Sequence, residues 1–386
     1  MKRKKRLLAP VLSLFALILT GLPGAFSAAV PKSTQEMLGK LRLDPSLLSD
    51  IDRELQVPKG WLDGAKKEGK LRIFSTFDPP QAKVLLRPFE ERYPFLANAI
   101  EYNRASHEDR AIRTLVAFKN KRFVTDILTG IGGSFFMYKE EGALEDLRNV
   151  PNIKNNPAGT FDPEGLWVGM HLRYWCMAYN TRMIKKEDVP KKWEDFLANP
   201  KWRNGNLALG NRPQLWALLL WKAKGEKWTK DFLTRLFSEV KPQLRREGMN
   251  AMLELLAAGE FYGSIPSAEY RTHQKVLDGA PVSYSCPEPV PAAVSEMGLL
   301  KGAPNANAAR LFINWFLSKE GQIAQYVSDF APPVHKGLQR REFVPFADQI
   351  LGKEQAFRDP AIELEIQPKL LEFWDELWLR GGGKRR

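Results

Sequence analysis

Short apolar strands and amphipathic helices alternate in the first half of the chain. Residues 70–75 alternate apolar and polar side chains, and a helical pattern follows over residues 81–92. The same order recurs as a strand over residues 99–102, a helix over residues 110–120 and a strand over residues 123–128. Strands that alternate with helices favour a parallel sheet covered by helices on both faces, which is the organisation of α/β proteins.

A second series of helices and strands fills the chain from residue 165 onward. In order, the pattern predicts a strand-like stretch over residues 174–180, a helix over 193–197, a strand over 206–209, an apolar helix over 213–225, helices over 230–238 and 248–259, a strand over 261–266, an extended stretch over 282–290, a strand over 296–301 and helices over 305–317 and 321–329. No repeat of fixed period occurs, which argues against solenoid and propeller folds. The length suffices for two globular domains.

The first residues have the pattern of an export signal. Five basic residues at positions 2–6 precede an apolar stretch over residues 7–22, and the small residues Ala25 and Ser27 follow it. This order predicts a signal peptide over residues 1–27 that is cleaved on export. A retained membrane anchor is the alternative, but the apolar stretch is shorter than the roughly 20 residues that a spanning helix needs. We therefore expect the mature protein in the periplasm.

The net charge gives only a weak indication of partners. The whole chain carries a formal charge of +13, of which five units belong to the predicted signal peptide. The sequence has no zinc-finger spacing and no aromatic ribonucleoprotein motif, so we expect no nucleic-acid partner. Attraction of an anionic ligand and an ordinary solvated surface both remain open as explanations of the excess positive charge.

Residue patterns typical of common enzymes do not occur. The sequence lacks a Gly-x-Ser-x-Gly elbow, a His-Glu-x-x-His pair and a phosphate-binding loop that ends in Gly-Lys-Ser or Gly-Lys-Thr. The histidines are scattered without the spacing of metal ligands, at His107, His171, His273 and His335. We expect no enzyme activity, no cofactor and no resident metal.

Two stretches resemble signatures of bacterial extracellular solute-binding proteins. Residues 189–206 contain Trp193 in an acidic context and then Pro-Lys-Trp and Gly205, and residues 301–322 resemble the closing helix of the same proteins. The resemblance covers about residues 60–340 and is greatest to the ferric-iron-type branch, which supplies ABC importers. It implies a monomeric periplasmic protein that delivers its ligand to an inner-membrane ABC permease.

The resemblance also implies the architecture, a type II periplasmic-binding fold. In this α/β fold, mixed sheets flanked by helices form two lobes, and a hinge of crossing strands joins them around the ligand. The implied division is a signal peptide over residues 1–27, an N-terminal helical extension over 28–69, a first lobe over 70–178 plus 287–345, a second lobe over 179–286, and a C-terminal helical segment with a basic tail over 346–386.

The two cysteines fall on the implied crossings. The first crossing corresponds to residues 174–180 and the return to residues 283–288, so Cys176 and Cys286 would lie on neighbouring hinge strands. A disulfide between them is one possibility. We expect two buried thiols instead, because free cysteine is among the most buried residue types.

Ligand contacts in the first lobe are expected beyond the carboxyl ends of the strands, where α/β sheets bind ligands. Ser75, Thr76 and Asp78 follow the first strand, and Arg104 and Ser106 follow the second. An arginine fork suits a carboxylate or a phosphate, whereas the hydroxyl groups could equally cap a helix.

A glycine-rich turn follows the third strand. Gly132, Gly133 and Ser134 would offer free backbone amides to an anion at the start of a helix. A tight turn that only needs the flexibility of glycine is the equal alternative.

The second lobe contributes Arg212, Tyr270 and Arg271 to the expected site. Ferric-binding relatives hold the metal with a histidine after the first strand and with an adjacent tyrosine pair. No histidine follows the first strand here, although Asp78 could supply an oxygen, and the tyrosine pair aligns with Tyr270 and Arg271. Fe(III) prefers several anionic oxygens, and an arginine in that position would repel it.

The sequence therefore predicts a hinge-closing solute-binding protein with a small anionic ligand. A ferric-iron-binding protein of the same fold is the first alternative. A secreted enzyme that uses the cleft between the lobes, and a ligand-sensing partner of a membrane receptor, are further alternatives.

Overall fold

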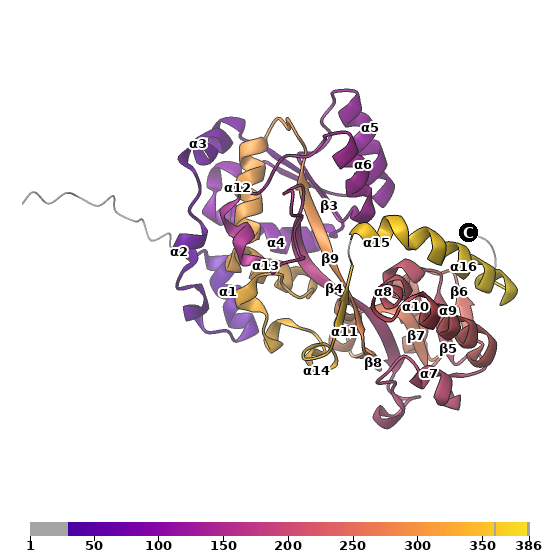
Figure 1. The fold of residues 1–386 in the computed structure, drawn as a ribbon. Coiled ribbons are helices and arrows are strands. Elements are labelled where there is room, and N and C mark those ends of the chain that lie inside the picture. The colour runs from indigo at the N-terminus through magenta and orange to yellow at the C-terminus, as the bar shows by residue number, and fades with distance from the viewer. Residues whose placement is uncertain (1–29, 359, 384–386) are drawn as a thin grey trace, which may run out of the picture.

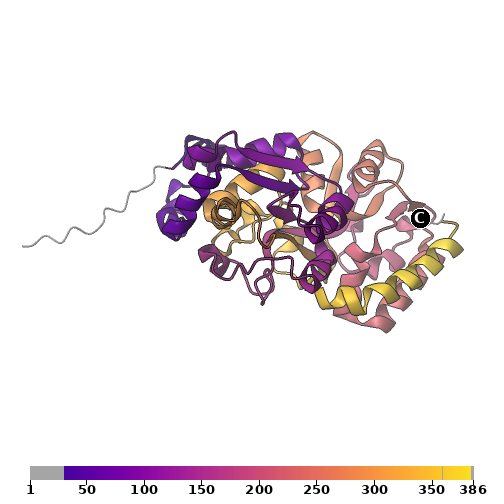
Figure 2. The same cartoon turned by 90° about the horizontal axis from the view of Figure 1, so that it is seen from above.

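The computed structural model describes residues 30–358 and 360–383, which fold into two lobes that lie side by side (Figure 1). The predicted signal peptide over residues 1–27 lies outside the described residues. Within those ranges, no helix combines the length and the apolar character needed to cross a membrane. Seen from above, helix α16 (Gln367–Arg380) runs along the outside of the second lobe (Figure 2).

The first lobe is built on a mixed sheet with the strand order β2, β1, β3, β9 and β4. The strands are β1 (Leu71–Ser75), β2 (Ile100–Arg104), β3 (Ile127–Thr129), β4 (Val168–Asn180) and β9 (Val290–Leu299). β1 lies parallel to β2 and to β3, whereas β9 runs antiparallel to β3 and to β4. The expected α/β class with mixed sheets is confirmed.

Helices cover this sheet and close the core of the first lobe. They are α1 (Lys32–Leu41), α2 (Ile51–Glu54), α3 (Lys59–Glu68), α4 (Pro79–Arg92), α5 (Thr114–Lys119), α6 (Phe135–Glu140), α12 (Ala306–Phe316), α13 (Lys319–Asp329) and α14 (Ala347–Ile350). α4 starts two residues before the predicted helix because prolines are tolerated in the first helical turn. Its Phe89 ring packs 5.2 Å from the ring of Phe312 and 5.1 Å from that of Trp315.

The second lobe has its own sheet, in which β4 is followed by β7, β5 and β6, with β8 on the other side of β4. The elements are β5 (Leu207–Gly210), β6 (Gln243–Arg245), β7 (Gly263–Ala268), β8 (Val282–Ser285), α7 (Asp195–Ala198), α8 (Ala217–Lys224), α9 (Glu226–Arg235), α10 (Met249–Ala258) and α11 (Glu269–Leu277). Tryptophans dominate the core: the ring of Trp216 stacks on Trp193 at 5.2 Å and meets Trp374 of α16 edge-on at 6.2 Å. The C-terminal helix thus completes the second lobe.

The chain passes between the lobes through paired strands. Residues 168–174 of β4 pair with β9, and the following residues pair with β7 and β8. The expected hinge of crossing strands is confirmed. The extended stretch predicted over residues 282–290 and the strand predicted over 296–301 are in fact β8 and the longer β9. β10 (Gln355–Phe357) adds to β9 in parallel and leads through α15 (Pro360–Glu365) to α16, so the C-terminal segment also connects the lobes.

The hinge contains a disulfide between Cys176 and Cys286, whose Cα atoms are 5.0 Å apart. Both cysteines are fully buried, as expected, but the expectation that they remain thiols is wrong. The physical reason is the pairing of β4 with β8, which aligns Met177 with Ser285 and so brings the flanking cysteines together. The disulfide closes a loop across 110 residues and ties the outgoing crossing to the returning one.

A buried carboxylate also fixes the hinge. Glu269 at the start of α11 accepts a hydrogen bond of 2.8 Å from the backbone N–H of Tyr174 and is fully buried. Burial raises the pKa of Glu269 to about 7, and Asp329 adds to the shift, although the Arg173 guanidinium opposes it. The charged form of Glu269 therefore costs stability in the folded protein.

Removal of the disulfide should destabilise the protein. We expect C176A/C286A to lower the free energy of unfolding by about 2–5 kcal/mol, because the unfolded chain is no longer restrained by the closed loop. Urea unfolding measures this, and reduced wild-type protein serves as the control that should unfold near the variant. Equal unfolding midpoints for the variant and the oxidised wild type would contradict a stabilising role.

The E269Q substitution should change how stability depends on pH. The ordinary carboxyl pKa of 4.5 is raised to about 7 in the folded state, so the wild type loses stability as pH rises between these values. E269Q cannot ionise and should lose less stability than the wild type between pH 5 and pH 7.5, as measured by urea unfolding. The exposed-residue variant E260Q should follow the wild type. Parallel pH profiles for E269Q and the wild type would refute the assignment.

Candidate ligand-binding site

A cavity of about 820 Å³ lies between the lobes. The loops after β1 and β3 line it on the side of the first lobe, and the turn after β5 and the start of α11 line it on the side of the second. The crossing strands β4 and β9 form its base, and residues of the C-terminal segment line it as well. A concave site between two lobes is a common location for small-molecule binding.

β4 presents two hydrogen-bond donors to this cavity, Arg173 and Trp175. Residues two apart in a strand face the same side, which brings both side chains to the base of the cavity. Arg173 Nη2 donates to Asp329 Oδ2 at 2.9 Å, and the guanidinium lies 4.0 Å from the ring centroid of Tyr270. Arg173 Nη1 and Trp175 Nε1 are both buried and have no hydrogen-bond partner among the described residues. A buried donor without an acceptor is costly, so this pair is suited to an acceptor-rich ligand.

The charge of Arg173 is secured by its neighbours. Burial opposes the charge, but Asp329, Tyr270 and Glu269 together raise the pKa of Arg173 above its ordinary value. Arg212 adds a second positive charge from the second lobe. The pKa of His107, which also lines the cavity, is lowered by burial and by Arg110 and Arg358. Of Arg173, Arg212 and His107, only the two arginines therefore bring a permanent positive charge to the cavity at neutral pH.

A buried arginine from outside the cavity orders two of its loops. Arg110 donates to the backbone oxygens of Ala105, Thr129 (2.9 Å) and Gly130 (3.2 Å). These contacts join the loop after β2 to the loop after β3. The glycine turn that follows β3 has positive φ at Gly130 (59°) and Gly132 (51°), a conformation that favours glycine over any residue with a Cβ.

Six of the eleven residues expected from the sequence line the cavity, and five do not. Those that line it are Thr76, Gly132, Gly133, Ser134, Arg212 and Tyr270. The other five are Ser75, Asp78, Arg104, Ser106 and Arg271, and each of them contacts other protein groups.

Two of the five, Ser75 and Ser106, use their hydroxyl groups in hydrogen bonds to other protein groups. Ser75 is buried and accepts a hydrogen bond of 2.6 Å from the hydroxyl of Tyr102. Ser106 donates to Asp109 Oδ2 at 2.6 Å and accepts from the backbone N–H of Asp109, as a helix cap does. Ser106 thus uses its hydroxyl group within its own loop.

The remaining three form an ion-pair group beside the cavity. Arg104 lies 2.7 Å from Asp78, and Arg271 lies 3.9 Å from the same carboxylate. Arg271 also donates to Gln274 Oε1 at 3.0 Å. The reason is topological, because β2 is the edge strand and its carboxyl end lies away from the crossing strands. Sequence order alone does not give that lateral position.

Sequence reasoning did not select Arg173, His107, Glu296, Arg358 and Glu363, although all five line the cavity. A signal for Arg173 was present, since it lies in the middle of an otherwise largely apolar, fully buried strand. Trp175 also lines the cavity, and the feature that matters here is its indole N–H, which has no hydrogen-bond partner among the described residues. Arg358 and Glu363 had no signal because they follow the stretch that carried the resemblance.

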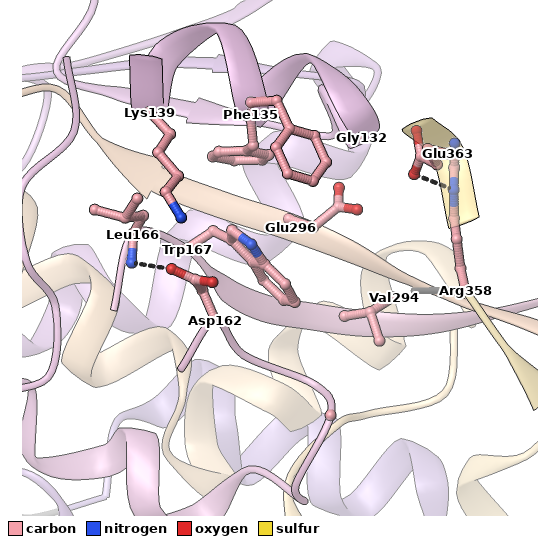
Figure 3. Close-up of a pocket in the computed structure, with 12 residues that line it drawn as sticks. Gly132, Phe135, Lys139, Asp162, Leu166, Trp167, Val294, Glu296, Arg358 and Glu363 are labelled. Atoms are coloured by element: carbon pink, nitrogen blue, oxygen red, sulfur yellow. Dashed lines mark hydrogen bonds and ion pairs between the residues drawn. The ribbon is translucent and has the colours of Figure 1, made fainter. Parts of the chain in front are cut away.

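A small side pocket of about 70 Å³ adjoins the main cavity near the glycine turn (Figure 3). Phe135 and Trp167 form aromatic walls, and Glu296 projects toward Gly132. Its volume is far below the 300–1,000 Å³ typical of ligand sites, so we regard it as an extension of the main cavity.

A model of the family described as bacterial extracellular solute-binding proteins matches residues 124–347. Among curated proteins, "Iron uptake protein A1" of Synechocystis sp. is 24% identical over 220 residues, which are 52% of this chain and 59% of that protein. "Iron uptake protein A2" of the same organism is 26% identical over 216 residues, 51% of this chain and 61% of that protein. The chain thus matches about three fifths of the length of these relatives.

Solved structures share the fold. Iron-bound HitA from Pseudomonas aeruginosa matches with a TM-score of 0.65 and 19% identity over 80% of this chain and 99% of that chain. An ABC transporter substrate-binding protein from Bradyrhizobium japonicum matches with a TM-score of 0.63 and 19% identity over the same shares. A Trichodesmium protein in complex with iron and citrate matches with a TM-score of 0.64 and 18% identity, again over 80% and 99%.

These findings identify the family. Because the family is one of binding proteins, they also confirm the expectation that the chain is not an enzyme. The matched range contains both crossing strands and the second-lobe elements from α7 to β8. Since it also exceeds half of the chain, this protein belongs to the bacterial extracellular solute-binding proteins.

Proposed function

We propose that this protein is the periplasmic solute-binding component of an ABC importer and that it closes its lobes over a small anionic ligand. The observation that carries this proposal is that Arg173 and Trp175 of β4 both line the cavity and that each has a buried donor, Arg173 Nη1 and Trp175 Nε1, without a hydrogen-bond partner among the described residues. A carboxylate or phosphonate oxygen would satisfy both donors. Thr76, Ser134 and the glycine turn would add contacts from the first lobe.

The hinge supports a closing motion. The lobes are joined by strands, and the ligand would lie above the point at which those strands cross. Direct ion pairing across the cleft is weak, since Arg271 of the second lobe lies 3.9 Å from Asp78 of the first. Ligand contacts from both lobes would favour the closed form, which the membrane permease then recognises.

The donor set favours an anion over a bare ferric ion. The Arg173 guanidinium lies over the ring of Tyr270, the phenol that would correspond to a metal ligand. In residues 30–358 and 360–383, no cluster of three or more His, Cys, Asp or Glu is arranged to hold a metal ion. A ferric chelate with a net negative charge would suit the same cavity, and the relatives named for iron uptake make it a ligand to test.

Identification of the bound molecule tests the proposal directly. Mature protein is purified without refolding, its ligand is released by denaturation, and the supernatant is analysed by mass spectrometry and by metal analysis. A stoichiometric organic anion, with or without a bound metal, supports the proposal. Stoichiometric iron without an organic anion would contradict it.

Substitutions on β4 test the residues that carry the proposal. Loss of a charged hydrogen bond should weaken ligand affinity by about 10- to 100-fold in R173Q. W175F should weaken affinity to a lesser degree, because a neutral donor is lost and no ion pair is disturbed. Isothermal titration calorimetry with the released ligand measures both affinities.

The R104Q variant is the matched control for these substitutions. Arg104 is exposed, pairs with Asp78 and lies outside the cavity, so its replacement should leave affinity unchanged. Equal losses for R104Q and R173Q would mean that the ligand binds elsewhere. Thermal unfolding of each variant identifies any loss of affinity that comes from misfolding.

A further inference from the structure

We propose that the C-terminal segment carries an internal competitor for the anionic ligand. In this proposal the carboxylate of Glu363 holds Arg358 beside the glycine turn, and a ligand anion binds Arg358 only when Glu363 leaves. The inference rests on the proposed anion-binding function and adds Arg358 to its binding residues. It assigns a role to a segment beyond residue 347, where the match to the family ends.

Both ends of the segment are anchored, one on each side of the cavity. At the first end, β10 pairs with β9, and the backbone N–H of Arg358 donates to Ala292 O at 2.9 Å. At the other end, α16 buries Leu370, Trp374, Leu377 and Trp378 in the core of the second lobe. Arg358 and residues 360–367 therefore lie along the side of the cavity as a strap, whose helix α15 Figure 1 shows in yellow between the lobes.

The middle of the strap is held less firmly than its ends. α15 has only six residues, and its Leu364 is 60% exposed although it lines the cavity. By contrast, Trp374 and Trp378 of α16 are almost completely buried. Of the α15 side chains that the structure describes, Leu364 and Glu365 are exposed. Because burial of apolar side chains is what stabilises a short helix in a protein, in this proposal α15 moves while α16 remains in place.

Arg358 and Glu363 form an ion pair at the edge of the cavity. Arg358 Nε lies 2.6 Å from Glu363 Oε1, and the side chains are only 21% and 10% exposed (Figure 3). The N–H of Arg358 Nε is not directed at an acceptor, so the contact is one of charge without a well-aligned hydrogen bond. A ligand carboxylate or phosphonate could bind the guanidinium bidentately, with better geometry.

The Glu363 carboxylate occupies the place at the glycine turn where a ligand anion would lie. A Cβ built on Gly133 would overlap Glu363 Oε2, and a Cβ on Gly132 would lie 3.6 Å from the Arg358 guanidinium. The turn thus receives a carboxylate from the chain itself. This is the same chemistry that the proposed ligand would bring.

The charges around Arg358 make it unfavourable for Glu363 and a ligand anion to occupy this site at the same time. Glu296 of β9 shares the site with Arg358 and Glu363. Burial raises the pKa of Glu296 to about 7, Arg358 lowers it, and Glu363 raises it further. The Glu363 carboxylate already pairs with the Arg358 guanidinium, and Glu296 adds negative charge when it is ionised, so a ligand anion would be repelled unless Glu363 moved away. Glu363, on the loosely held α15, is the one that can move.

Neutralisation of each partner tests the competition, with citrate as the probe in isothermal titration calorimetry on the full-length mature protein. E363Q removes the competing charge and should bind citrate about tenfold more tightly than the wild type. R358Q, alone or combined with E363Q, should bind citrate about tenfold more weakly, because the ligand loses its cation.

E376Q is the matched control for these variants. Glu376 pairs with Arg380 at 3.4 Å on the exposed side of α16, away from the cavity, so its neutralisation should leave citrate affinity unchanged. Affinities of E363Q and R358Q equal to the wild type, while R173Q abolishes citrate binding, would overturn the competition but leave the proposed function intact. Failure of both the wild type and E363Q to bind citrate would also overturn it, and the released-ligand analysis would then judge the proposed function separately.

A reversible cross-link tests whether α15 must move away from the glycine turn. The ideal Cβ position on Gly133 lies 3.6 Å from Cβ of Glu363, within the range that disulfides span. Oxidised G133C/E363C should bind citrate about tenfold more weakly than its reduced form, as R358Q does, because the disulfide holds α15 at the glycine turn and blocks access to Arg358. The same variant in its reduced form is the control. Mild reduction should leave the native disulfide intact, because that disulfide is fully buried. Equal citrate binding by the oxidised and reduced forms would overturn the proposal.

Discussion

The structure of both lobes depends on the continuous backbone pairing of β4. This strand of 13 residues pairs with β9 in the first lobe and with β7 and β8 in the second. Because alternate residues of a strand face opposite sides, the strand separates two tasks. The side chains of Arg173 and Trp175 line the cavity, whereas the side chain of Cys176 is bonded to Cys286. Between them, the backbone N–H of Tyr174 donates to Glu269. The same few residues therefore hold the hinge and present the donors.

Burial is what makes the polar groups of this hinge specific. Arg173 keeps its charge because Asp329 accepts one of its hydrogen bonds, yet its second terminal nitrogen has no acceptor in the described structure. Two carboxyl groups, Glu269 and Glu296, have pKa values raised to about 7 by burial. Exposure to water would remove these shifts in pKa. In a desolvated cleft, the interaction energy of one correctly placed anionic oxygen is much larger than it would be on an open surface.

The C-terminal segment adds a connection between the lobes that lies outside the matched family range. β10 is tied to β9 by backbone hydrogen bonds, and α16 supplies Trp374 and Trp378 to the core of the second lobe. Any change in the angle between the lobes must therefore move the strap that carries Arg358 and Glu363. In the proposed function, this covalent connection would couple lobe closure to access to Arg358.

The sequence by itself determined the α/β class, the two lobes and the family. Local periodicity indicates strands and helices, and the motif around Trp193 and residues 200–205 is contiguous, so both are readable without tertiary contacts. The same local reasoning found the glycine turn and Arg212, which the structure brings to the cavity. The resemblance to the family placed the two cysteines on neighbouring strands, but neither it nor local pattern decides whether two such thiols are bonded.

Only the tertiary structure decided which polar residues meet. Arg104 follows a strand as expected, but the lateral order of the sheet puts that strand at the edge, where Arg104 pairs with Asp78. Arg173 looks like part of a buried strand in sequence. It becomes a binding candidate only because it lines the cavity between the lobes and its buried Nη1 has no hydrogen-bond partner among the described residues. Arg358 and Glu363 reach the site from the end of the chain through pairing with β9. Long-range packing sets these positions, since hydrophobic burial and strand order are properties of the whole fold and not of any short segment.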